Sequence, residues 1–310
     1  MTWSTADIPD LSGRRAVITG VTGGLGLATA IELARHGAAL TVTARDVRKG
    51  EEYLDRLRAQ VPAAEVELQL LDLADLDSAK RAASDVADRH RQIDIVINNA
   101  GIMIPPKSTT ADGFELQMGT NHLGHFAWTA TLWPTLKASA ARVVTVASLA
   151  HTAAGELDLQ ALAPGGRPGR YRRWQTYGQS KLANLMFALE LDRRTKAAGV
   201  DVVSVAAHPG YAATNLQGAG LNLGRSRIPG MAIHQVSRVL GQPAAHGAWP
   251  SLMAATDTSL TGGEYVGPSG PGQLRGRPKL VGMTKAARDE EAADRLWTAS
   301  EDAAGVTFTV

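Results

Sequence analysis

Tyr177 and Lys181 stand four residues apart in the segment YGQSKLAN, which we predict to be helical. Residues at this spacing share one face of a helix, so the phenol and the ammonium can lie close together. A free tyrosine has a pKa of about 10, and a nearby ammonium favours the phenolate and lowers that pKa. Tyr177 is therefore a candidate to give a proton to a carbonyl oxygen or to take one from an alcohol. The alternative for such a pair is an ordinary solvated helix face.

Ser148 ends the apolar run RVVTVAS at 142–148, 29 residues before Tyr177. Its hydroxyl can hydrogen-bond the same substrate oxygen that Tyr177 serves. The chain has no cysteine, which excludes a thiol nucleophile, a disulfide framework, an iron–sulfur cluster and a cysteine-ligated zinc. The chemistry therefore depends on oxygen and nitrogen groups or on a bound organic cofactor.

A glycine-rich stretch, TGVTGGLG at 19–26, separates the apolar run AVI at 16–18 from the helical pattern LGLATAIELA. At a strand-to-helix junction, peptide N–H groups at the helix N-terminus can face a pyrophosphate. We expect Gly20 to permit a tight turn, Gly24 to let a phosphate oxygen approach, and Gly26 to allow close packing of the helix on the strand. The alternative is a glycine-rich loop that binds nothing.

Short apolar runs recur along the chain and alternate with helical patterns. Runs rich in Val, Ile and Leu, typical of strands covered on both faces, lie at 15–19, 39–44, 66–72, 93–98, 142–148 and 200–207. This alternation predicts an α/β fold: a Rossmann-type doubly wound parallel sheet in a three-layer αβα arrangement, with residues 1–310 as a single domain.

Local signals predict several boundaries. Asp77 or Ser78 can cap a helix that runs to about His90. The run GGEYVGP at 262–268 predicts an edge strand. A final helix is predicted from about Thr284 to Ser300.

Two stretches interrupt the alternation. The first, at 155–174, contains PGGRPGRYRR and cannot be regular throughout. Its arginines could attract an acidic substrate, although a solvated insert is the favoured explanation. The second, at 217–243, is a polar, glycine-containing insert that follows the carboxyl edge of the sheet. Its apolar residues suggest a lid over a substrate, and core packing explains them equally.

The bulk composition limits the partners. Of 310 residues, 44% are hydrophobic and 20% are charged, as in ordinary globular proteins. The net charge of +2 gives no broad electrostatic footprint for nucleic acid or an anionic membrane, so neither partner is expected. The first fifteen residues lack the apolar core of a signal peptide, and no stretch approaches the length of a transmembrane span. We therefore expect a cytoplasmic protein.

Six motifs in order resemble those of the short-chain dehydrogenase/reductase family. Besides the glycine turn, the chain carries NNAG at 98–101, Asn121 in GTNHLGHF, a serine ending the fifth strand, YGQSKLAN, and HPGYAAT at 208–214. NHLGHF, YGQSKLAN and the chain length are similar to the retinol-dehydrogenase-like branch of lipophilic carbonyl reductases. The chain departs from short members of the family in its long Ser148–Tyr177 spacing. It also has no hydrophobic anchor, so a membrane-associated retinoid enzyme is not implied.

The resemblance implies roles for particular residues. The implied catalytic set is Asn121, Ser148, Tyr177 and Lys181. Within it, Asn121 would organise a water-linked proton path from Lys181. Asp72 would meet the adenine, and Thr214 the nicotinamide carboxamide. The implied cofactor contacts are Gly20, Thr22, Gly24, Leu25, Gly26, Arg45, Asp72, Leu73, Asn99, Ala100, Gly101, Tyr177, Lys181, Pro209, Gly210 and Thr214.

The residue after the second strand selects between dinucleotides. An acidic residue there binds the ribose 2′-hydroxyl of NAD, whereas arginine suits the 2′-phosphate of NADP. Arg45 in TARDVRKG occupies the position that the resemblance assigns to this residue, and Lys49 can assist, so we predict NADP(H). Asp46 keeps NAD(H) as the alternative. Gly23 supplies no side-chain donor where relatives often have one.

His122 and His125, three residues apart, have a spacing that can ligate a metal. No third ligand is indicated, and we expect both to pack and hydrogen-bond around the helix that bears Asn121. His208, which precedes Pro209, is likewise interpreted as structural. No metal is predicted.

These features together predict an NADP(H)-dependent oxidoreductase that interconverts an alcohol and an aldehyde or ketone on a moderately hydrophobic substrate. One alternative is a sensor or scaffold that binds NADP without chemistry, which has no need of an intact Ser, Tyr and Lys. Another is an epimerase or dehydratase that transfers hydride only transiently. Members of the family are often dimers or tetramers, so a homo-oligomer is a further expectation, although inserts can block the shared helix faces.

Overall fold

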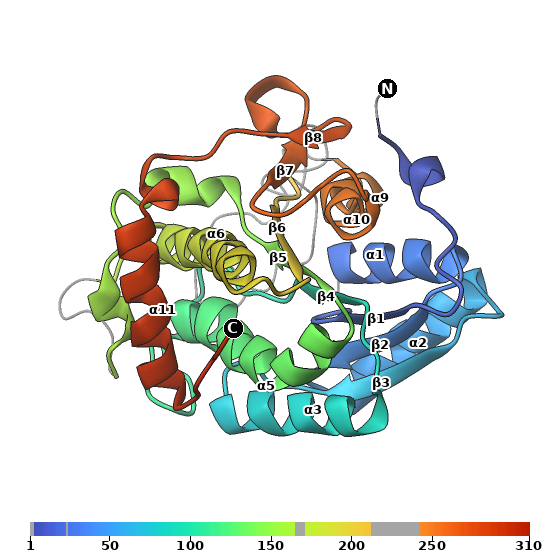
Figure 1. Cartoon of the computed structure of the whole chain (residues 1–310), viewed down its shortest axis with the longest axis horizontal. Coiled ribbons are helices and arrows are strands. Elements are labelled where there is room, and N and C mark those ends of the chain that lie inside the picture. Colours follow the sequence, from blue (N-terminus) through green and yellow to red (C-terminus); the bar gives the residue numbers. More distant parts are fainter. Residues whose placement is uncertain (1–2, 23, 165–170, 212–241) are drawn as a thin grey trace.

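The computed structural model describes residues 3–22, 24–164, 171–211 and 242–310. Within them, eight strands form one sheet in the order β3-β2-β1-β4-β5-β6-β7-β8 (Figure 1). All neighbours pair in parallel except β8, which is antiparallel to β7. The strands are β1 (Arg15–Ile18), β2 (Ala39–Ala44), β3 (Val66–Leu70), β4 (Ile95–Asn98), β5 (Arg142–Val146), β6 (Val203–Ala207), β7 (Tyr265–Pro268) and β8 (Pro278–Leu280).

Each of the six apolar runs predicted as a strand contains one, because helices cover both faces of the sheet. The run at 262–268, predicted as an edge strand, does contain a strand, β7, but its position at the edge of the sheet is wrong. The chain after β7 turns back and places β8 outside it, where Val266 pairs with Leu280 and Pro268 with Pro278. The run preceding β8 carries no apolar alternation that would have signalled this return.

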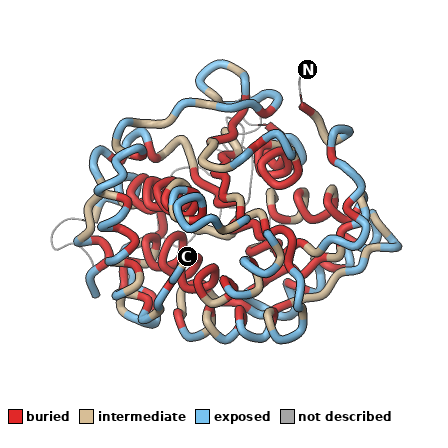
Figure 2. The backbone as a smooth tube through the Cα atoms, in the orientation of Figure 1, coloured by how far each residue is buried: buried red, intermediate tan, exposed pale blue. Residues whose placement is uncertain are grey.

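Helices lie on both faces of the sheet and complete three layers (Figures 1 and 2). Alternate residues of a strand point to opposite faces, so Val17 enters one core while Ala16 and Ile18 enter the other. One face is covered by α1 (Gly24–Arg35), α2 (Val47–Gln60), α9 (Ala244–Gly247) and α10 (Trp249–Thr256). The other face is covered by α3 (Leu76–Arg89), α5 (Gly124–Ala138) and α6 (Arg173–Ala198), with α4 (Leu116–Met118) leading into α5.

The N-terminus of α3 is capped by Asp75 rather than by the predicted Asp77 or Ser78. Asp75 has extended backbone angles, and its carboxylate accepts the backbone N–H of Ser78 at 2.9 Å. An N-cap must have its side-chain oxygen in front of the first free amides, and Asp77 already lies inside the first turn.

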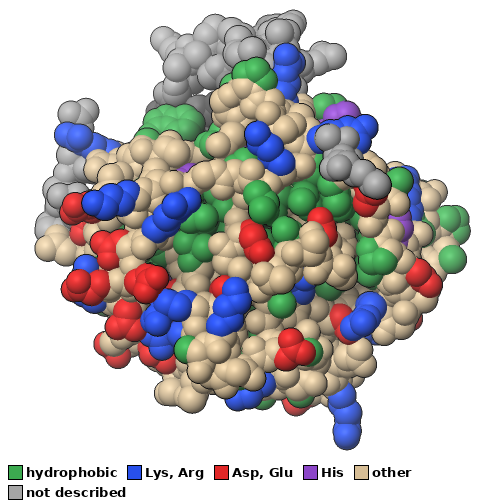
Figure 3. Space-filling view, turned by 45° about the horizontal axis from the view of Figure 1, so that its top comes forward, with side chains coloured by type: hydrophobic (Ala, Val, Ile, Leu, Met, Phe, Trp, Pro, Cys, Tyr) green, Lys and Arg blue, Asp and Glu red, His purple; other side chains and the backbone are tan. Residues whose placement is uncertain are grey.

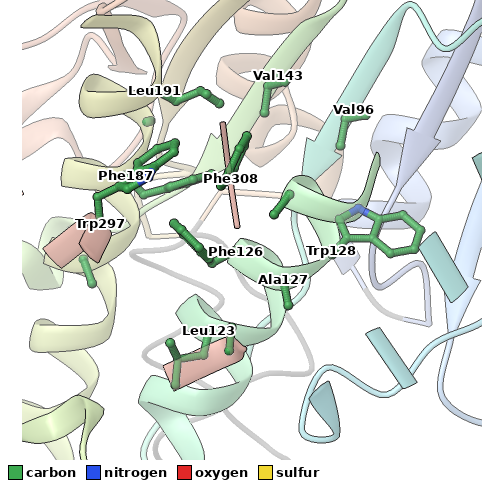
Figure 4. Close-up of a cluster of buried hydrophobic side chains, with 14 of the residues drawn as sticks. Val96, Leu123, Phe126, Ala127, Trp128, Val143, Phe187, Leu191, Trp297 and Phe308 are labelled. Atoms are coloured by element: carbon green, nitrogen blue, oxygen red, sulfur yellow. The ribbon is translucent and has the colours of Figure 1, made fainter. Parts of the chain in front are cut away.

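The last helix, α11 (Glu290–Ala304), packs outside α5 and α6 through an aromatic cluster (Figure 4). The Phe126 ring centroid lies 5.6 Å from that of Phe187, 5.2 Å from Trp297 and 5.5 Å from Phe308, all in edge-on arrangements that aromatic rings favour. The predicted helix from 284 starts too early, because Asp289 caps α11 and a separate short 3-10 turn precedes it.

The two predicted inserts are described only in part. In the first, residues 155–164 include a short 3-10 helix, η4 (Leu159–Leu162), and α6 already begins at Arg173. Residues 165–170 lie outside the described ranges. Of the second insert, only Gln242 and Pro243 are described, so the predicted lid at 217–243 lies almost entirely outside them.

Candidate active site

The site lies where the strand order reverses between β1 and β4, which is where open α/β sheets bind ligands at their carboxyl edge. The turn after β1 passes directly in front of the loop after β4. At Gly20, which has a φ of +75°, an added Cβ would lie 2.7 Å from the Cβ of Ala100. At Gly26 an added Cβ would lie 2.4 Å from the carbonyl oxygen of Gly20. Only glycine fits at either position.

Thr19 fastens this turn to the loop after β4. Its hydroxyl oxygen accepts the backbone N–H of Asn99 at 2.9 Å and that of Ala100 at 3.0 Å. The side-chain amide of Asn99 donates in return to the carbonyl oxygens of Thr19 and Gly20, at 2.8 and 3.1 Å. The turn and the loop are therefore held together by the chain's own hydrogen bonds.

The residues present fit a dinucleotide. The twelve-residue helix α1 begins at Gly24, and its first turn contains no acidic side chain to repel a phosphate. Helix N-termini offer free backbone N–H groups and a favourable dipole to such an anion. Gly20, Gly24 and Gly26 leave this end of the helix without side chains beyond Cα, and Thr22 and Leu25 are only half-buried beside them. The turn can thus receive the pyrophosphate of a nucleotide cofactor.

Ser148, Tyr177 and Lys181 converge at the carboxyl end of β5. Ser148 follows β5 and caps a 3-10 helix, η3 (Leu149–Ala153), while Tyr177 and Lys181 lie one turn apart on α6. The Tyr177 hydroxyl is hydrogen-bonded to the Ser148 side chain. The approach of η3 to α6 needs Gly178, where an added Cβ would lie 2.8 Å from the carbonyl oxygen of Ala150.

Burial dominates the acidity of the phenol. It raises the pKa of Tyr177 to about 12, and the hydrogen bond with Ser148 offsets only part of that rise. The sequence-based expectation of a lowered pKa is wrong for the folded chain as it stands, because burial disfavours the phenolate more strongly than the neighbouring groups favour it. Tyr177 therefore keeps its proton at neutral pH.

Lys181 is buried, with 3% of its surface exposed. Its Nζ donates a hydrogen bond to the carbonyl oxygen of Val146 at 2.9 Å. Burial lowers its pKa to about 8, because an ammonium loses its hydration there. The amine therefore titrates just above neutral pH.

Asn121 lies in η2 (Gly119–Leu123), a turn of π-helix between α4 and α5, a feature frequent at functional sites. Its side-chain oxygen accepts the N–H of Ile102 at 2.8 Å, and its amide nitrogen donates to the carbonyl oxygen of Ile102 and the hydroxyl of Ser180. A Cβ added at Gly101 would lie 3.2 Å from Asn121 Oδ1 and 3.5 Å from Lys181 Nζ. Gly101 thus borders both predicted catalytic residues.

The residues after β2 bear on the choice of dinucleotide. Arg45 and Lys49 are exposed. Asp46 is committed to the N-terminus of α2, where its carboxylate accepts the N–H of Lys49 at 2.9 Å, and this bond lowers its pKa. After β3, Asp72 accepts the N–H of Ala74 at 2.9 Å. The carboxylate of Asp46, which could favour NAD, thus already has a structural partner in the backbone of α2.

The remaining predicted contacts lie in different surroundings. Leu73 is buried against α5, where a Cβ at Gly124 would come within 2.3 Å of its carbonyl oxygen. Pro209 and Gly210 follow β6, and Gly210 has a φ of +65°. Thr214 and Gly23 fall outside the described ranges.

A family model for short chain dehydrogenases matches residues 14–157. Over 306 residues the chain is 37% identical to retinol dehydrogenase 13 of Homo sapiens, covering 98% of this chain and 87% of that protein. The chain belongs to the short-chain dehydrogenase/reductase family. It is 36% identical over 301 residues to polyprenol dehydrogenase of Mus musculus, covering 94% of this chain and 83% of that protein. A crystal structure of a protein from Mycobacterium paratuberculosis matches this dehydrogenase/reductase with a TM-score of 0.81 at 41% identity, covering 100% of both chains.

As a short-chain dehydrogenase/reductase, the chain is an NAD(P)-dependent oxidoreductase that acts on CH–OH groups. Among its described helices, none combines the length and the apolarity needed to cross a membrane. Acidic and basic side chains are interspersed over the face shown in Figure 3. The described ranges also contain no group of three or more His, Asp or Glu side chains arranged to hold a metal ion.

Three histidines of this dehydrogenase/reductase are buried and hydrogen-bonded. His122 Nε2 lies 2.8 Å from the hydroxyl of Ser300, and His208 Nε2 lies 3.0 Å from the side-chain oxygen of Gln273. The ring of His125 is hydrogen-bonded to Thr19 and to the backbone of Asn121. Burial lowers the pKa of His122 to about 3 and those of His125 and His208 to about 4, so all three are neutral at pH 7.

Sequence reasoning missed two residues beside the catalytic group. His151 lies in η3, with Nδ1 2.7 Å from the carbonyl oxygen of Ser148, and its ring packs edge-on against Tyr265 with centroids 5.5 Å apart. Within the described part of the chain, His151 Nε2 and the Tyr265 hydroxyl are buried without a hydrogen-bond partner. A charge on Tyr177 would raise the pKa of Tyr265 further. The sequence could have indicated that His151 lies beside the site, because it follows Ser148 by only three residues. No sequence pattern around Tyr265 indicates that it lies there.

Proposed function

We propose that this dehydrogenase/reductase is an NADP(H)-dependent enzyme that interconverts an alcohol and an aldehyde or ketone, with Tyr177 as the acid and base. The observation that carries the proposal is the hydrogen bond between Ser148 and Tyr177, with Lys181 one helical turn away, beside a glycine turn that fits a dinucleotide. A sensor or scaffold protein would gain nothing from burying Ser148, Tyr177 and Lys181 together at the edge of the sheet where the cofactor binds.

Tyr177 is suited to protonate a carbonyl oxygen. Its pKa of about 12 keeps the phenol neutral, and Ser148 can donate a second hydrogen bond to the same oxygen. The bound nicotinamide cofactor would supply the hydride in reduction and take it in oxidation. Oxidation needs the phenolate, which the ammonium of Lys181 favours. Gly101, close to both Asn121 and Lys181, leaves room for the water-linked proton path that the family resemblance implies.

The preference for NADP(H) is supported by the surroundings of β2. Arg45 and Lys49 are exposed there, and a guanidinium can pair with a 2′-phosphate through charge-assisted hydrogen bonds. Asp46, the residue that would favour NAD(H), is the N-cap of α2.

The substrate class is a moderately hydrophobic alcohol or carbonyl compound. Two relatives are named for retinol and polyprenol, both apolar alcohols, at 37% and 36% identity. A cytoplasmic location is part of the same proposal.

The central experiment compares wild type with Tyr177→Phe in NADPH-dependent reduction of a panel of aldehydes and ketones that includes retinal. Loss of the acid should lower kcat about 100-fold or more, the size of a general-acid contribution. Tyr53→Phe makes the same chemical change on α2, away from the site, and should leave turnover unchanged. Equal activity of Tyr177→Phe and wild type would refute the assignment. Tight NADPH binding without reduction of any compound would instead indicate a sensor.

Cofactor choice is tested by thermal shifts with NADPH, NADP, NADH and NAD, since a ligand of the folded state raises the apparent melting temperature. The phosphorylated pair should give the larger shifts, and Arg45→Ala should remove the difference. The matched control is Arg56→Ala, because Arg56 is exposed like Arg45 but lies within α2. Equal shifts for all four nucleotides in wild type would remove the argument from Arg45.

A further inference from the structure

His125 lies at the start of α5, four residues after Asn121, and its ring faces Thr19 at the beginning of the glycine turn. The side chain is 1% exposed. Its Nε2 lies 2.8 Å from the hydroxyl oxygen of Thr19, at the end of β1, and its Nδ1 lies 2.9 Å from the carbonyl oxygen of Asn121. The ring therefore ties the helical segment that carries both Asn121 and His125 to the turn after β1.

The hydrogen-bond partners determine where each proton lies. The carbonyl oxygen of Asn121 can only accept, so Nδ1 carries the ring proton and Nε2 is an acceptor. The hydroxyl of Thr19 must then donate to Nε2, and its oxygen accepts the N–H groups of Asn99 and Ala100. Its other acceptor, the carbonyl oxygen of Ile97, is more distant at 3.4 Å. Every donor and acceptor in this chain of bonds is used.

Only a neutral imidazole satisfies this arrangement. A proton on Nε2 would face a threonine hydroxyl whose oxygen already accepts two N–H groups. The charged groups that act on the ring favour the same state, since the ammonium of Lys181 opposes a second positive charge nearby. The other titratable ring in reach, His122, is itself neutral.

We propose that His125 is a positioning residue that fixes the nucleotide-binding turn and the helix of Asn121 relative to each other. This inference rests on the proposed function. Through Thr19, the ring holds the turn that faces the dinucleotide. Through the carbonyl oxygen of Asn121, it holds the π-helical turn whose side chain anchors Ile102 beside Gly101 and Lys181.

Two substitutions separate the two ends of the ring. An asparagine amide nitrogen is as many bonds from Cα as Nδ1, so His125→Asn can still donate to Asn121 but loses Thr19. A glutamine amide oxygen is as many bonds from Cα as Nε2, so His125→Gln can still accept from Thr19 but loses Asn121. Asn and Gln are thus complementary half-replacements of one imidazole.

The readouts are the Kd for NADPH, measured by ligand fluorescence, and kcat for a carbonyl substrate. We expect His125→Asn to raise the Kd about 3- to 10-fold, the worth of one neutral hydrogen bond, with kcat little changed. We expect His125→Gln to keep the Kd within about twofold and to lower kcat about 10-fold. His122→Asn, a buried histidine whose partner is Ser300 on α11, controls for general damage to the core. If both His125 variants change Kd and kcat in parallel, or match His122→Asn, the proposal is overturned.

Thr19 provides a second route if the His125 variants do not fold. Thr19→Ser keeps the hydroxyl, whereas Thr19→Val keeps the shape and leaves the N–H groups of Asn99 and Ala100 without their acceptor. Thr19→Ser should bind NADPH like wild type and Thr19→Val about 10-fold more weakly. Unchanged binding by Thr19→Val would contradict the proposal. The Kd for NADPH can be measured without turnover. A failure of the positioning proposal can therefore be told apart from a failure of the oxidoreductase assignment, which Tyr177→Phe tests.

Discussion

The Nζ atom of Lys181 lies 6.0 Å from the centre of the Tyr177 ring, one turn along the same buried helix. Burial favours the neutral form of each group. It raises the pKa of the Tyr177 phenol to about 12 and lowers the pKa of the Lys181 ammonium to about 8. The pair therefore has an ammonium below about pH 8 and two neutral groups above it, and this difference makes the role of Lys181 measurable.

Carbonyl reduction should weaken as the pH rises through about 8. Below this pH Lys181 is charged, and above it the ammonium is lost while Tyr177 is still protonated. If reduction needs the ammonium, log kcat/KM should fall by about one per pH unit above pH 8. The profile of Lys181→Arg should lose this step, since a guanidinium stays charged. A wild-type profile that is flat through pH 8 would show that the charge is not required.

Lys181→Met should abolish turnover and yet stabilise the protein at pH 7. A pKa lowered from 10.5 to about 8 corresponds to roughly 3 kcal/mol of unfavourable burial of the charged form. The carbonyl oxygen of Val146 would keep a partner, because the side-chain amide of Asn184 also donates to it at 3.2 Å. We expect the free energy of unfolding to rise by about 1–3 kcal/mol, measured by urea titration.

The pH dependence of that gain has a definite sign. Between about pH 8 and 10.5 the native wild type has lost a proton that the unfolded chain still binds, so wild-type stability rises with pH there. The advantage of Lys181→Met should therefore shrink over this interval. A variant that is less stable than wild type at every pH would mean that Lys181 contributes packing beyond its charge.

Acid should destabilise the fold through its buried histidines. His122, His125 and His208 have native pKa values of about 3, 4 and 4, below the ordinary value of 6.5, so the unfolded chain binds more protons between these limits. Stability is then present above about pH 6.5 and is lost as the pH falls, by about 1.4 kcal/mol per pH unit for each histidine. Urea unfolding at pH 7 and 5 measures this slope.

Variants assign the slope to particular rings. His122→Asn should reduce the loss between pH 7 and 5 by one histidine's share, whatever its effect on absolute stability. His246→Asn, at an exposed position, should leave the slope unchanged. A slope that does not respond to His122→Asn would place the acid sensitivity in other groups.

Sequence patterns predicted the strands and the shared helix face of Tyr177 and Lys181 well, because each depends on local rules: continuous apolar runs for buried strands and a four-residue spacing for a helix face. The approach of Ser148 to that face was expected from the family resemblance and not from a local rule. The sequence patterns failed where contacts between distant segments determine the pairing of a strand or the pKa of a side chain. Strand β8 follows from a chain reversal after β7, and the raised pKa of Tyr177 follows from burial by segments distant in sequence. The bridge from His125 to Thr19 joins residues 106 apart in sequence, which no local pattern could show.

Phe308 should be a large single contributor to the attachment of the C-terminal segment. It is 2% exposed, and its ring lies 4.6 Å from Trp297, 5.3 Å from Trp133 and 5.5 Å from Phe126 (Figure 4). Because several rings enclose it, the cavity left by Phe308→Ala cannot close easily, and we expect a loss of about 3–5 kcal/mol in the free energy of unfolding.

Thr309→Ala, at the exposed neighbouring residue, should change stability by no more than about 0.5 kcal/mol. The aromatic cluster meets α6 at Phe187, ten residues beyond Tyr177, so kcat of Phe308→Ala measured well below its melting temperature should remain near that of wild type. A loss of stability under about 1 kcal/mol would show that α11 is held by its other contacts rather than by this ring. A fall in kcat without a change in stability would instead mean that the outer helix acts on the active site through α6.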